Sequence, residues 1–200
     1  PMKSYIQTSR PRTSFLAYET RHAHTGIPVK TGCRLKLCAV VCLMACCTAI
    51  AAQATNYYWQ DGAGGTFADS GNWSPAGVPG TADSAYFDIE ANYTVTFTDS
   101  VTNSSVRFYK PTAGGTAILA IGTNTYNLEG SYGMYVNGAG GSASATLTSG
   151  VLTCQNYAYI GSTTAGNSFT VSGTGRFGSV TRGIVVGDDS ASGNNTLTVT

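Results

Sequence analysis

The chain is poor in charge, and beyond residue 54 it has no histidine and only one cysteine. Charged residues make up 10% of the 200 residues. Both histidines, His22 and His24, stand within the segment 1–36, and Cys154 is the single cysteine after residue 54. The absence of histidine there excludes a Ser-His-Asp triad and a histidine metal site. A single cysteine excludes an intramolecular disulfide and a cysteine zinc site.

Positive charge is concentrated at the beginning of the chain. Residues 1–36 carry seven Lys or Arg against Glu19, whereas residues 55–200 carry four basic residues against nine acids. The four basic residues are Arg107, Lys110, Arg176 and Arg182. A nucleic-acid surface needs clustered Lys and Arg to displace counterions. The acidic balance of the later part therefore argues against nucleic acid as a partner.

The segment 1–54 has the organisation of a secretory signal. A basic, irregular leader over 1–36 ends in Arg34-Leu-Lys36, and an apolar run over 37–54 ends in Ala52-Gln-Ala54 before the chain turns polar. A signal peptide combines a positive flank, an apolar stretch shorter than the roughly 20 residues of a membrane span, and a small-x-small exit. We therefore expect export to the cell surface or the medium, with cleavage after Ala54.

Two alternatives for this segment remain open. In the first, the apolar run is an uncleaved anchor. In the second, Leu43-Met-Ala-Cys46 is a bacterial lipoprotein box with a lipidated Cys46, although the chain stays apolar beyond that cysteine. The irregular leader before Arg34, which contains His22 and His24, indicates a misplaced start of translation rather than a metal pair.

Residues 55–100 form a Trp-bearing module with many turns. Gly and Pro clusters mark tight turns, and Tyr93–Phe97 alternates in the manner of a half-buried strand. Trp59 and Trp73 are its candidate ligand-stacking residues, with their rings as platforms for a sugar. The alternative, which we favour, is an apolar plug that closes the first coil of a repeat fold.

The module also contains short motifs in a fixed order. They are a Trp, a Gly-rich turn, Gly-Asn-Trp, Val-Pro-Gly, Asp-x-Ala-x-Phe and a Thr-Val-Thr-Phe strand, carried by Trp59, Gly62 to Gly65, Gly71, Asn72, Trp73, Pro79, Gly80, Asp83, Ala85 and Phe87. This order resembles the N-terminal opening of bacterial autotransporter-associated β-strand repeat proteins, many of which carry PEP-CTERM type sorting tails. The resemblance covers 57–200. It implies an exported, surface-located parallel β-helix that is capped by the Trp-bearing module, and it brings no assigned activity.

From residue 101 onward the sequence repeats itself as short Thr-rich segments. Gly161 recurs as Gly187, Val171 recurs as Val199, and the dipeptide Ser149-Gly150 recurs as Ser172-Gly173. The steps differ, and an irregular period of about 25 residues fits one coil of a β-solenoid. We therefore expect an all-β fold with almost no helix, in which a capping module over 55–100 precedes a parallel β-helix over 101–200. Large side chains should point inward, and Thr and Ser outward. A β-sandwich is the alternative architecture.

No set of catalytic, cofactor-binding or metal-ligating residues stands out. Asp61, Asp83 and Asp88, or the pair Asp188-Asp189, could bind Ca²⁺ or pair their carboxylates, but short acids more commonly cap turns. Cys154 is expected to be a small buried hydrophobe rather than a reactive thiol. We accordingly expect no catalytic residue, no cofactor and no metal.

The expected function is that of an exported structural or adhesive cell-surface solenoid without catalysis, with an extracellular polysaccharide or matrix as its partner. The alternative is a carbohydrate-binding or polysaccharide-degrading β-helix. Thr and Ser on the outside would favour the first function, and acids and aromatics aligned on one outer face of successive coils would favour the second. Because Thr200 falls inside an expected strand, we expect a longer protein. Contact with a membrane is expected only through the signal peptide or a further C-terminal anchor.

Overall fold

The computed structural model describes residues 53–110, 114–138, 141–179, 181–188 and 193–200. Residues 1–52, which hold most of the expected signal segment with His22, His24 and Cys46, lie outside these residues, as does Asp189. The described residues contain one short 3-10 helix, η1 (Ser70–Asn72), and thirteen strands. The strands are β1 (Asn56–Trp59), β2 (Gly65–Thr66), β3 (Trp73–Ser74), β4 (Ser84–Phe87), β5 (Tyr93–Thr96), β6 (Val101–Phe108), β7 (Ala117–Val136), β8 (Ser144–Cys154), β9 (Tyr157–Ile160), β10 (Ser168–Val171), β11 (Arg176–Ser179), β12 (Gly183–Val186) and β13 (Thr196–Val199).

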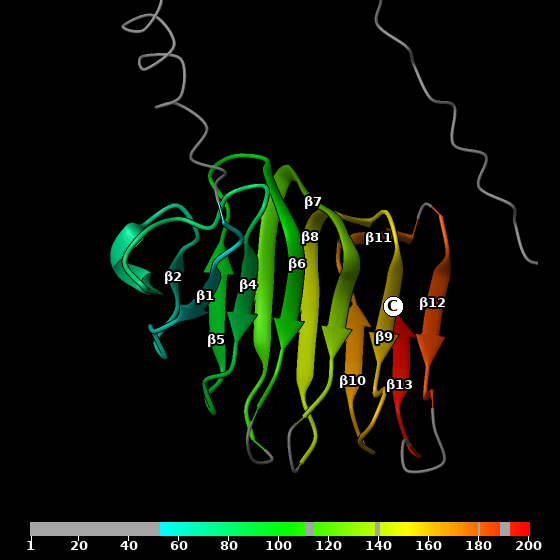
Figure 1. Cartoon of the computed structure of the whole chain (residues 1–200). Helices are drawn as coiled ribbons and strands as arrows, with labels where there is room; N and C mark the ends of the chain where they lie inside the picture. Colours follow the sequence, from blue (N-terminus) through cyan, green and yellow to red (C-terminus); the bar gives the residue numbers. More distant parts are fainter. Residues whose placement is uncertain (1–52, 111–113, 139–140, 180, 189–192) are drawn as a thin grey trace, which may run out of the picture. The chain divides into compact units, whose positions relative to one another are not determined.

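The strands coil into a β-solenoid of about five turns, in which each complete turn passes through three parallel sheets. In Figure 1 the strands lie side by side, and their colours pass from cyan through green and yellow to orange and red. The first sheet consists of β1, β4, residues 105–108 of β6, 133–136 of β7, β9 and β12. The second consists of β2, β5, 117–120 of β7, 144–147 of β8, β10 and β13. The third consists of 101–103 of β6, 125–128 of β7, 151–154 of β8 and β11.

The long strands β6, β7 and β8 turn the corners between these sheets, so that one strand contributes to two or three of them. All of the pairings between successive coils are parallel, as in a β-helix, and in these pairings each residue has its partner one coil further along the chain. A sandwich would require two antiparallel sheets packed face to face. The expected parallel β-helix is therefore confirmed, and the sandwich is excluded.

The beginning of the solenoid is closed by an aromatic cluster. β3 pairs with β1 in the antiparallel direction and brings Trp73 opposite Trp59. The two indole rings meet edge to face at 5.0 Å, and Phe67 packs edge-on against Trp73 at 4.9 Å. β4 and β5 hydrogen-bond to β6 and β7, so the sheets run without a break across residue 100.

The interior is apolar because alternate residues of each strand point inward. One inward column of the first sheet consists of Phe87, Phe108, Val136 and Ile160, all fully buried. The rings of Phe87 and Phe108 stack at 5.4 Å. Burying such side chains contributes about 1.5–3 kcal/mol each, which makes these columns the main source of stability.

One buried polar side chain links the loops of neighbouring coils. Asn167 precedes β10 and is fully buried, and its Oδ1 accepts hydrogen bonds from the backbone N–H groups of Gly138 and Ala143. Its Nδ2 donates to Thr164 and to Oδ1 of Asn195, which occupies the same position one coil further. The side chain thus satisfies backbone groups that would otherwise be buried without partners.

Among the described residues, no helix has the length and hydropathy needed to cross a membrane.

Candidate functional site

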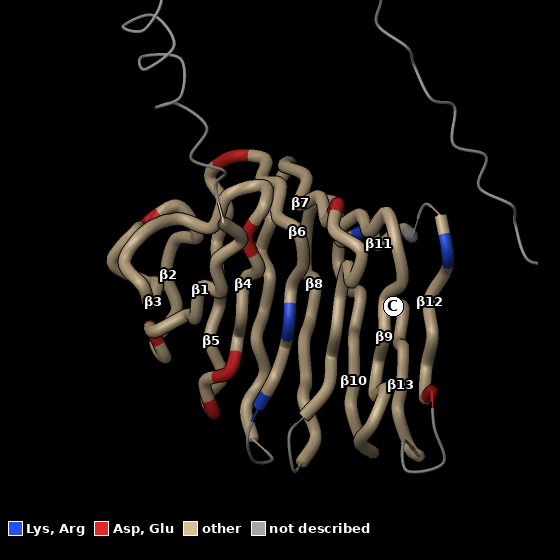
Figure 2. Tube along the Cα trace, viewed as in Figure 1, with Lys and Arg blue, Asp and Glu red and all other residues tan. Residues whose placement is uncertain are grey.

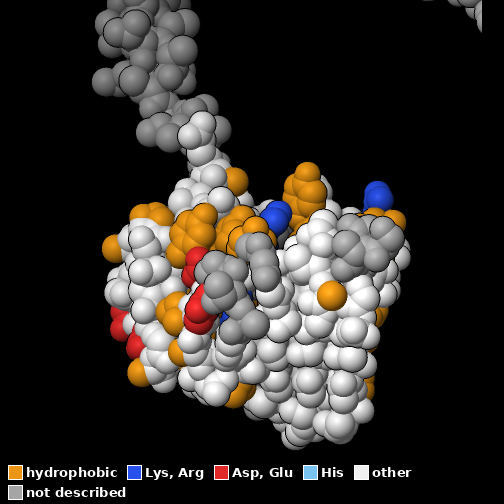
Figure 3. Space-filling model, turned by 90° about the horizontal axis from the view of Figure 1, so that it is seen from below, with side chains coloured by type: hydrophobic (Ala, Val, Ile, Leu, Met, Phe, Trp, Pro, Cys, Tyr) orange, Lys and Arg blue, Asp and Glu red, His pale blue; other side chains and the backbone are white. Residues whose placement is uncertain are grey.

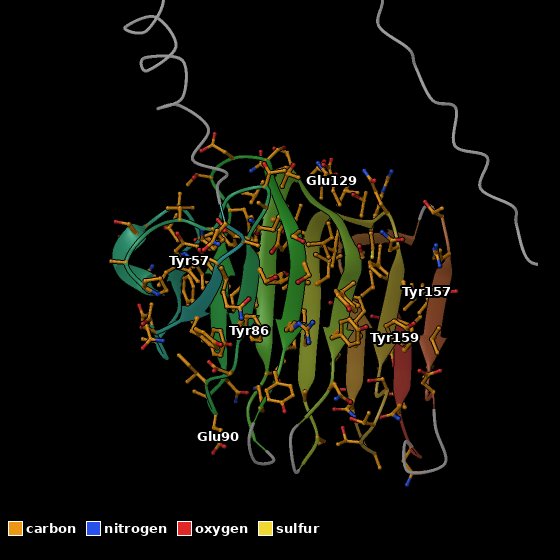
Figure 4. The ribbon with its side chains drawn as sticks, in the orientation of Figure 1. Tyr57, Tyr86, Glu90, Glu129, Tyr157 and Tyr159 are labelled. Carbon is orange, nitrogen blue, oxygen red and sulfur yellow. The ribbon has the colours of Figure 1, made fainter. Side chains whose placement is uncertain are left out.

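The outward positions of the first sheet carry a column of aromatic residues. Tyr58, Tyr86, Arg107, Tyr135 and Tyr159 are paired one after another by the parallel register of β1, β4, β6, β7 and β9. We call these five residues the tyrosine ladder. They point outward because the residues on either side of each belong to the buried inward columns. Figure 4 shows Tyr86 and Tyr159 at similar heights on strands of this sheet.

The ladder has regular geometry. The rings of Tyr58 and Tyr86 lie 4.8 Å apart between centroids, and those of Tyr135 and Tyr159 lie 4.9 Å apart. These separations match the distance between adjacent strands, about 4.8 Å. The backbone hydrogen bonds of the sheet therefore set the spacing of the rings.

Arg107 occupies the middle of the ladder and lies between tyrosine rings on both sides. Its Cζ is 4.9 Å from the ring centroid of Tyr135 and 5.7 Å from that of Tyr86. Tyr132, which is 61% exposed, approaches the same guanidinium at 5.8 Å. An arginine within about 6 Å of a ring face is attracted by the ring quadrupole, so the tyrosines hold this cation in place.

Further side chains widen the surface beside the ladder. Tyr157 packs against Tyr159 with centroids 5.4 Å apart, and Cζ of Arg182 lies 5.6 Å from the Tyr157 ring. Figure 3, viewed from below the orientation of Figure 1, shows hydrophobic and basic side chains projecting along one edge of the described solenoid. Figure 2 shows how few charged residues the described coils carry, since most of the tube is tan.

The phenols of Tyr86, Tyr135 and Tyr159 are neutral near pH 7. Partial burial raises the pKa of Tyr86 and of Tyr135 above the ordinary value near 10, and the Arg107 guanidinium opposes only part of that rise. Asp188 is the acid whose charge acts on Tyr135 and Tyr159. Because neighbouring rings and Arg107 cover one another's faces, the ladder offers the outer edges of its aromatic rings, hydroxyl groups that donate and accept, and one fixed cation.

The structure places the two tryptophans in the core rather than at this surface. Trp59 is fully buried and Trp73 is 3% exposed. Their Nε1 atoms donate to the backbone carbonyls of Asp61, at 2.6 Å, and Phe67, at 2.8 Å. Neither ring offers a free face to a ligand, and both have the packing expected of an apolar plug.

The acids of the opening module cap turns. Oδ1 of Asp61 accepts from Ala63 N, and the two carboxylate oxygens of Asp83 accept from Thr55 N and Gly80 N. Within the described ranges, no group of three or more His, Cys, Asp or Glu side chains is placed to hold a metal ion. Asp188 is exposed at the end of β12.

Asp88 behaves differently because it is half-buried. Burial raises the pKa of its carboxyl, and a hydrogen bond from its own backbone opposes part of the rise. An acid whose pKa is raised by folding stabilises the fold only when protonated, and this contribution is lost as the pH rises from its unfolded pKa through its folded pKa.

We therefore expect Asp88→Asn to raise the Tm near pH 7, with a gain that shrinks to nothing near pH 3, where the wild-type carboxyl is protonated in both states. Thermal unfolding followed by circular dichroism at the two pH values measures this. Asp99→Asn is the control that removes an equal charge from an exposed position. An equal gain at both pH values would contradict the explanation.

Cys154 is buried, as predicted. It is a free thiol at the end of β8, and its Sγ donates to the backbone carbonyl of Tyr157 at 3.2 Å. Burial raises the pKa of this thiol, so it remains protonated and unreactive at neutral pH.

The tyrosine ladder is therefore the surface that the sequence did not reveal. The sequence does contain four similar tripeptides in which a large polar or aromatic residue stands between two apolar ones. They are Ala85-Tyr-Phe87, Val106-Arg-Phe108, Met134-Tyr-Val136 and Ala158-Tyr-Ile160. No protein-family model matches the chain, and no curated protein or solved structure is significantly similar to it. The fold defines the chain as a parallel β-solenoid, and any function has to be argued from the ladder itself.

Proposed function

We propose that the chain is an exported adhesive β-solenoid that binds an extended polysaccharide along the tyrosine ladder without cleaving it. The observation that carries the proposal is the alignment of Tyr58, Tyr86, Tyr135 and Tyr159 on one outer face of successive coils. The basic leader and the apolar run over 37–54 support export. The resemblance of the opening module to surface-located repeat proteins supports the same location.

The spacing of the ladder suits a polymer of sugars. One coil advances about 4.8 Å along the solenoid, close to the length of one pyranose unit in an extended chain. Sugar rings have apolar C–H groups that can pack against the exposed edges of the aromatic rings, and tyrosine adds a hydroxyl for the polar rim of the sugar. Successive units of a glycan can therefore meet successive ladder positions.

Binding rather than hydrolysis is proposed because of the charges beside the ladder. Glycoside hydrolases ordinarily use two carboxyl groups that face each other across the scissile bond. Among the described residues, Asp188 is the acid whose charge acts on Tyr135 and Tyr159, and the other charged groups beside these rings are the cations Arg107 and Arg182.

The test is a triple variant, Tyr86→Ser, Tyr135→Ser and Tyr159→Ser, in the full chain. Retention on a panel of plant, algal and bacterial polysaccharides is measured by affinity electrophoresis. We expect the wild type to be retarded by at least one extended polysaccharide, and the triple variant to bind it at least about tenfold more weakly. Thermal unfolding should show that the variant still folds, because these side chains point away from the core.

A matched control changes three outward residues of the second sheet, with Thr94→Ala, Thr146→Ala and Thr170→Ala. These threonines are half-buried on strands of the same solenoid. The control should bind like the wild type. A wild type that binds no member of the panel, or a triple variant that binds as the wild type does, would overturn the proposal.

A further inference from the structure

Arg107 differs from the rest of the ladder in carrying a charge with no internal counterion. Its guanidinium lies against the rings of Tyr86, Tyr132 and Tyr135. Within the described part of the chain it forms no ion pair and donates no hydrogen bond. Its Nε is buried and has no hydrogen-bond partner there. An arginine used only for stability would ordinarily be paired with an acid or fully solvated. Because the described residues accept no hydrogen bond from the terminal N–H groups of Arg107, these donors are available to a ligand.

The rings fix the orientation of this arginine. Guanidinium groups stack on aromatic faces while their N–H donors stay in the plane of the group. That plane forms a fork matching the two oxygens of a carboxylate, which it binds with paired, charge-assisted hydrogen bonds. A carboxylate carried by a sugar ring that packs on Tyr86 or Tyr135 would meet this fork.

A second cation, Arg182, lies further along the same surface, and its distance from Arg107 indicates how far apart two anionic groups of a ligand would be. Arg182 lies beside Tyr157 and immediately precedes Gly183, which pairs with Tyr157. Between the coil of Arg107 and that of Arg182 there are three coil steps, through β7, β9 and β12, or about 14 Å along the solenoid. The cations are therefore separated by more than two sugar units, with tyrosine rings between them.

Resting on the proposed function, we propose that the ligand is an acidic polysaccharide in which uronate residues are separated by neutral sugars. Arg107 binds a uronate carboxylate, and Tyr135 and Tyr159 pack against the neutral units that follow. The charge of Asp188 acts on the same rings, and it would repel a polysaccharide that carries an anion on every sugar unit. The ligand should therefore be only sparsely charged.

Single-stranded nucleic acid also stacks on aromatic side chains, but the charges disfavour it. Such binding uses a positively charged groove that follows the phosphate backbone. Residues 55–200 hold four basic residues against nine acids, and the ladder itself contains one cation. A sparsely charged polysaccharide is the polyanion that fits this balance.

The experiment compares two matched ligands on the full chain. One is an oligosaccharide of gellan, whose glucuronate residues are separated by neutral sugars, and the other is the same oligosaccharide with its carboxyl groups reduced to alcohols. Calorimetry should show about tenfold tighter binding of the acidic form. The preference should shrink as NaCl is raised from about 0.05 M to about 0.5 M, because salt screens an exposed pair.

The variants assign that preference to one side chain. Arg107→Gln should lose the preference for the acidic form while retaining the affinity for the reduced form. Arg176→Gln, which removes the same charge from an exposed position on the third sheet, should leave the preference unchanged. Asp188→Asn should strengthen binding of the acidic form.

The outcomes separate this inference from the proposed function. Equal wild-type affinity for the acidic and reduced forms, or equal effects of Arg107→Gln and Arg176→Gln, would overturn the inference and leave glycan binding intact. Dextran sulfate or a single-stranded oligonucleotide that binds more tightly than gellan would also overturn it. If the full chain binds none of the polysaccharide panel, both proposals fail.

Discussion

Replacing Trp59 by alanine is expected to lower the free energy of unfolding by about 3–5 kcal/mol. The indole is fully buried, meets Trp73 edge to face, and lies 6.0 Å from the ring of Phe87. Its removal leaves a cavity and takes one of two hydrogen bonds from the Asp61 carbonyl, which also accepts from Gly64 N. Urea unfolding followed by the fluorescence of Trp73, the other tryptophan of the chain, measures the loss where it occurs.

Tyr58→Ala is the matched control for this substitution. Tyr58 is the preceding residue, is 36% exposed and points outward, so its removal should cost less than about 1 kcal/mol. In a repeat fold each coil contacts mainly its neighbours, so the first coil should unfold before the later ones in Trp59→Ala. Equal losses for the two variants would contradict the packing described for β1.

Replacing Asn167 by alanine is expected to cost about 2–5 kcal/mol. The substitution leaves the backbone N–H groups of Gly138 and Ala143 buried without an acceptor, at about 1–3 kcal/mol each. It also removes the hydrogen bond to Asn195 that ties one coil to the next, and the hydrogen bond to Thr164 within the same loop. Chemical denaturation monitored by far-UV circular dichroism measures the change.

Asn127→Ala provides the comparison. Asn127 is half-buried on the third sheet, and its Oδ1 accepts a hydrogen bond from the Thr153 hydroxyl. Both groups can turn to water when the bond is broken, so the cost should stay below about 1 kcal/mol. If Asn167→Ala were no more destabilising than Asn127→Ala, the buried asparagine would not be holding the coils together.

The coil length and the order of the strands could be predicted because similar residues recur at the inward-facing and corner positions of successive coils. The recurrence of Val171 as Val199 is the observed register, and that of Gly161 as Gly187 follows from the pairing of Ile160 with Val186. Inward residues are constrained by stacking in every coil, so their recurrence in sequence reflects contact in space.

The recurring dipeptides Ser149-Gly150 and Ser172-Gly173 are not paired with each other in the structure. Leu147 pairs with Val171 and Val151 pairs with Arg176, and both of these offsets are longer than the step between the dipeptides. The dipeptides lie at the corner between the second and third sheets, where the later coil has an extra residue. Hydrogen bonds from Ser172 N to Leu147 O and from Thr174 N to Thr148 O continue at this corner, but the extra residue shifts the register, so similar residues there need not be paired.

The outer surface was predicted only in part. Thr94, Thr146 and Thr170 do point outward on the second sheet, as expected. The tyrosine ladder on the first sheet was missed because alternation within one strand does not say which residues of different coils become neighbours. That depends on loop lengths, which vary: the interval along the chain from Tyr86 to Arg107 is shorter than the interval from Arg107 to Tyr135.

The parallel register gives the ladder a property that its side chains do not determine. Backbone hydrogen bonds fix the distance from one coil to the next, whatever residues the outward positions hold. The backbone therefore sets the spacing between recognition positions along the solenoid, and the side chains set the chemistry at each position. Substitutions at the ladder can change which chemical group is recognised at each coil and leave the distance between coils unaltered.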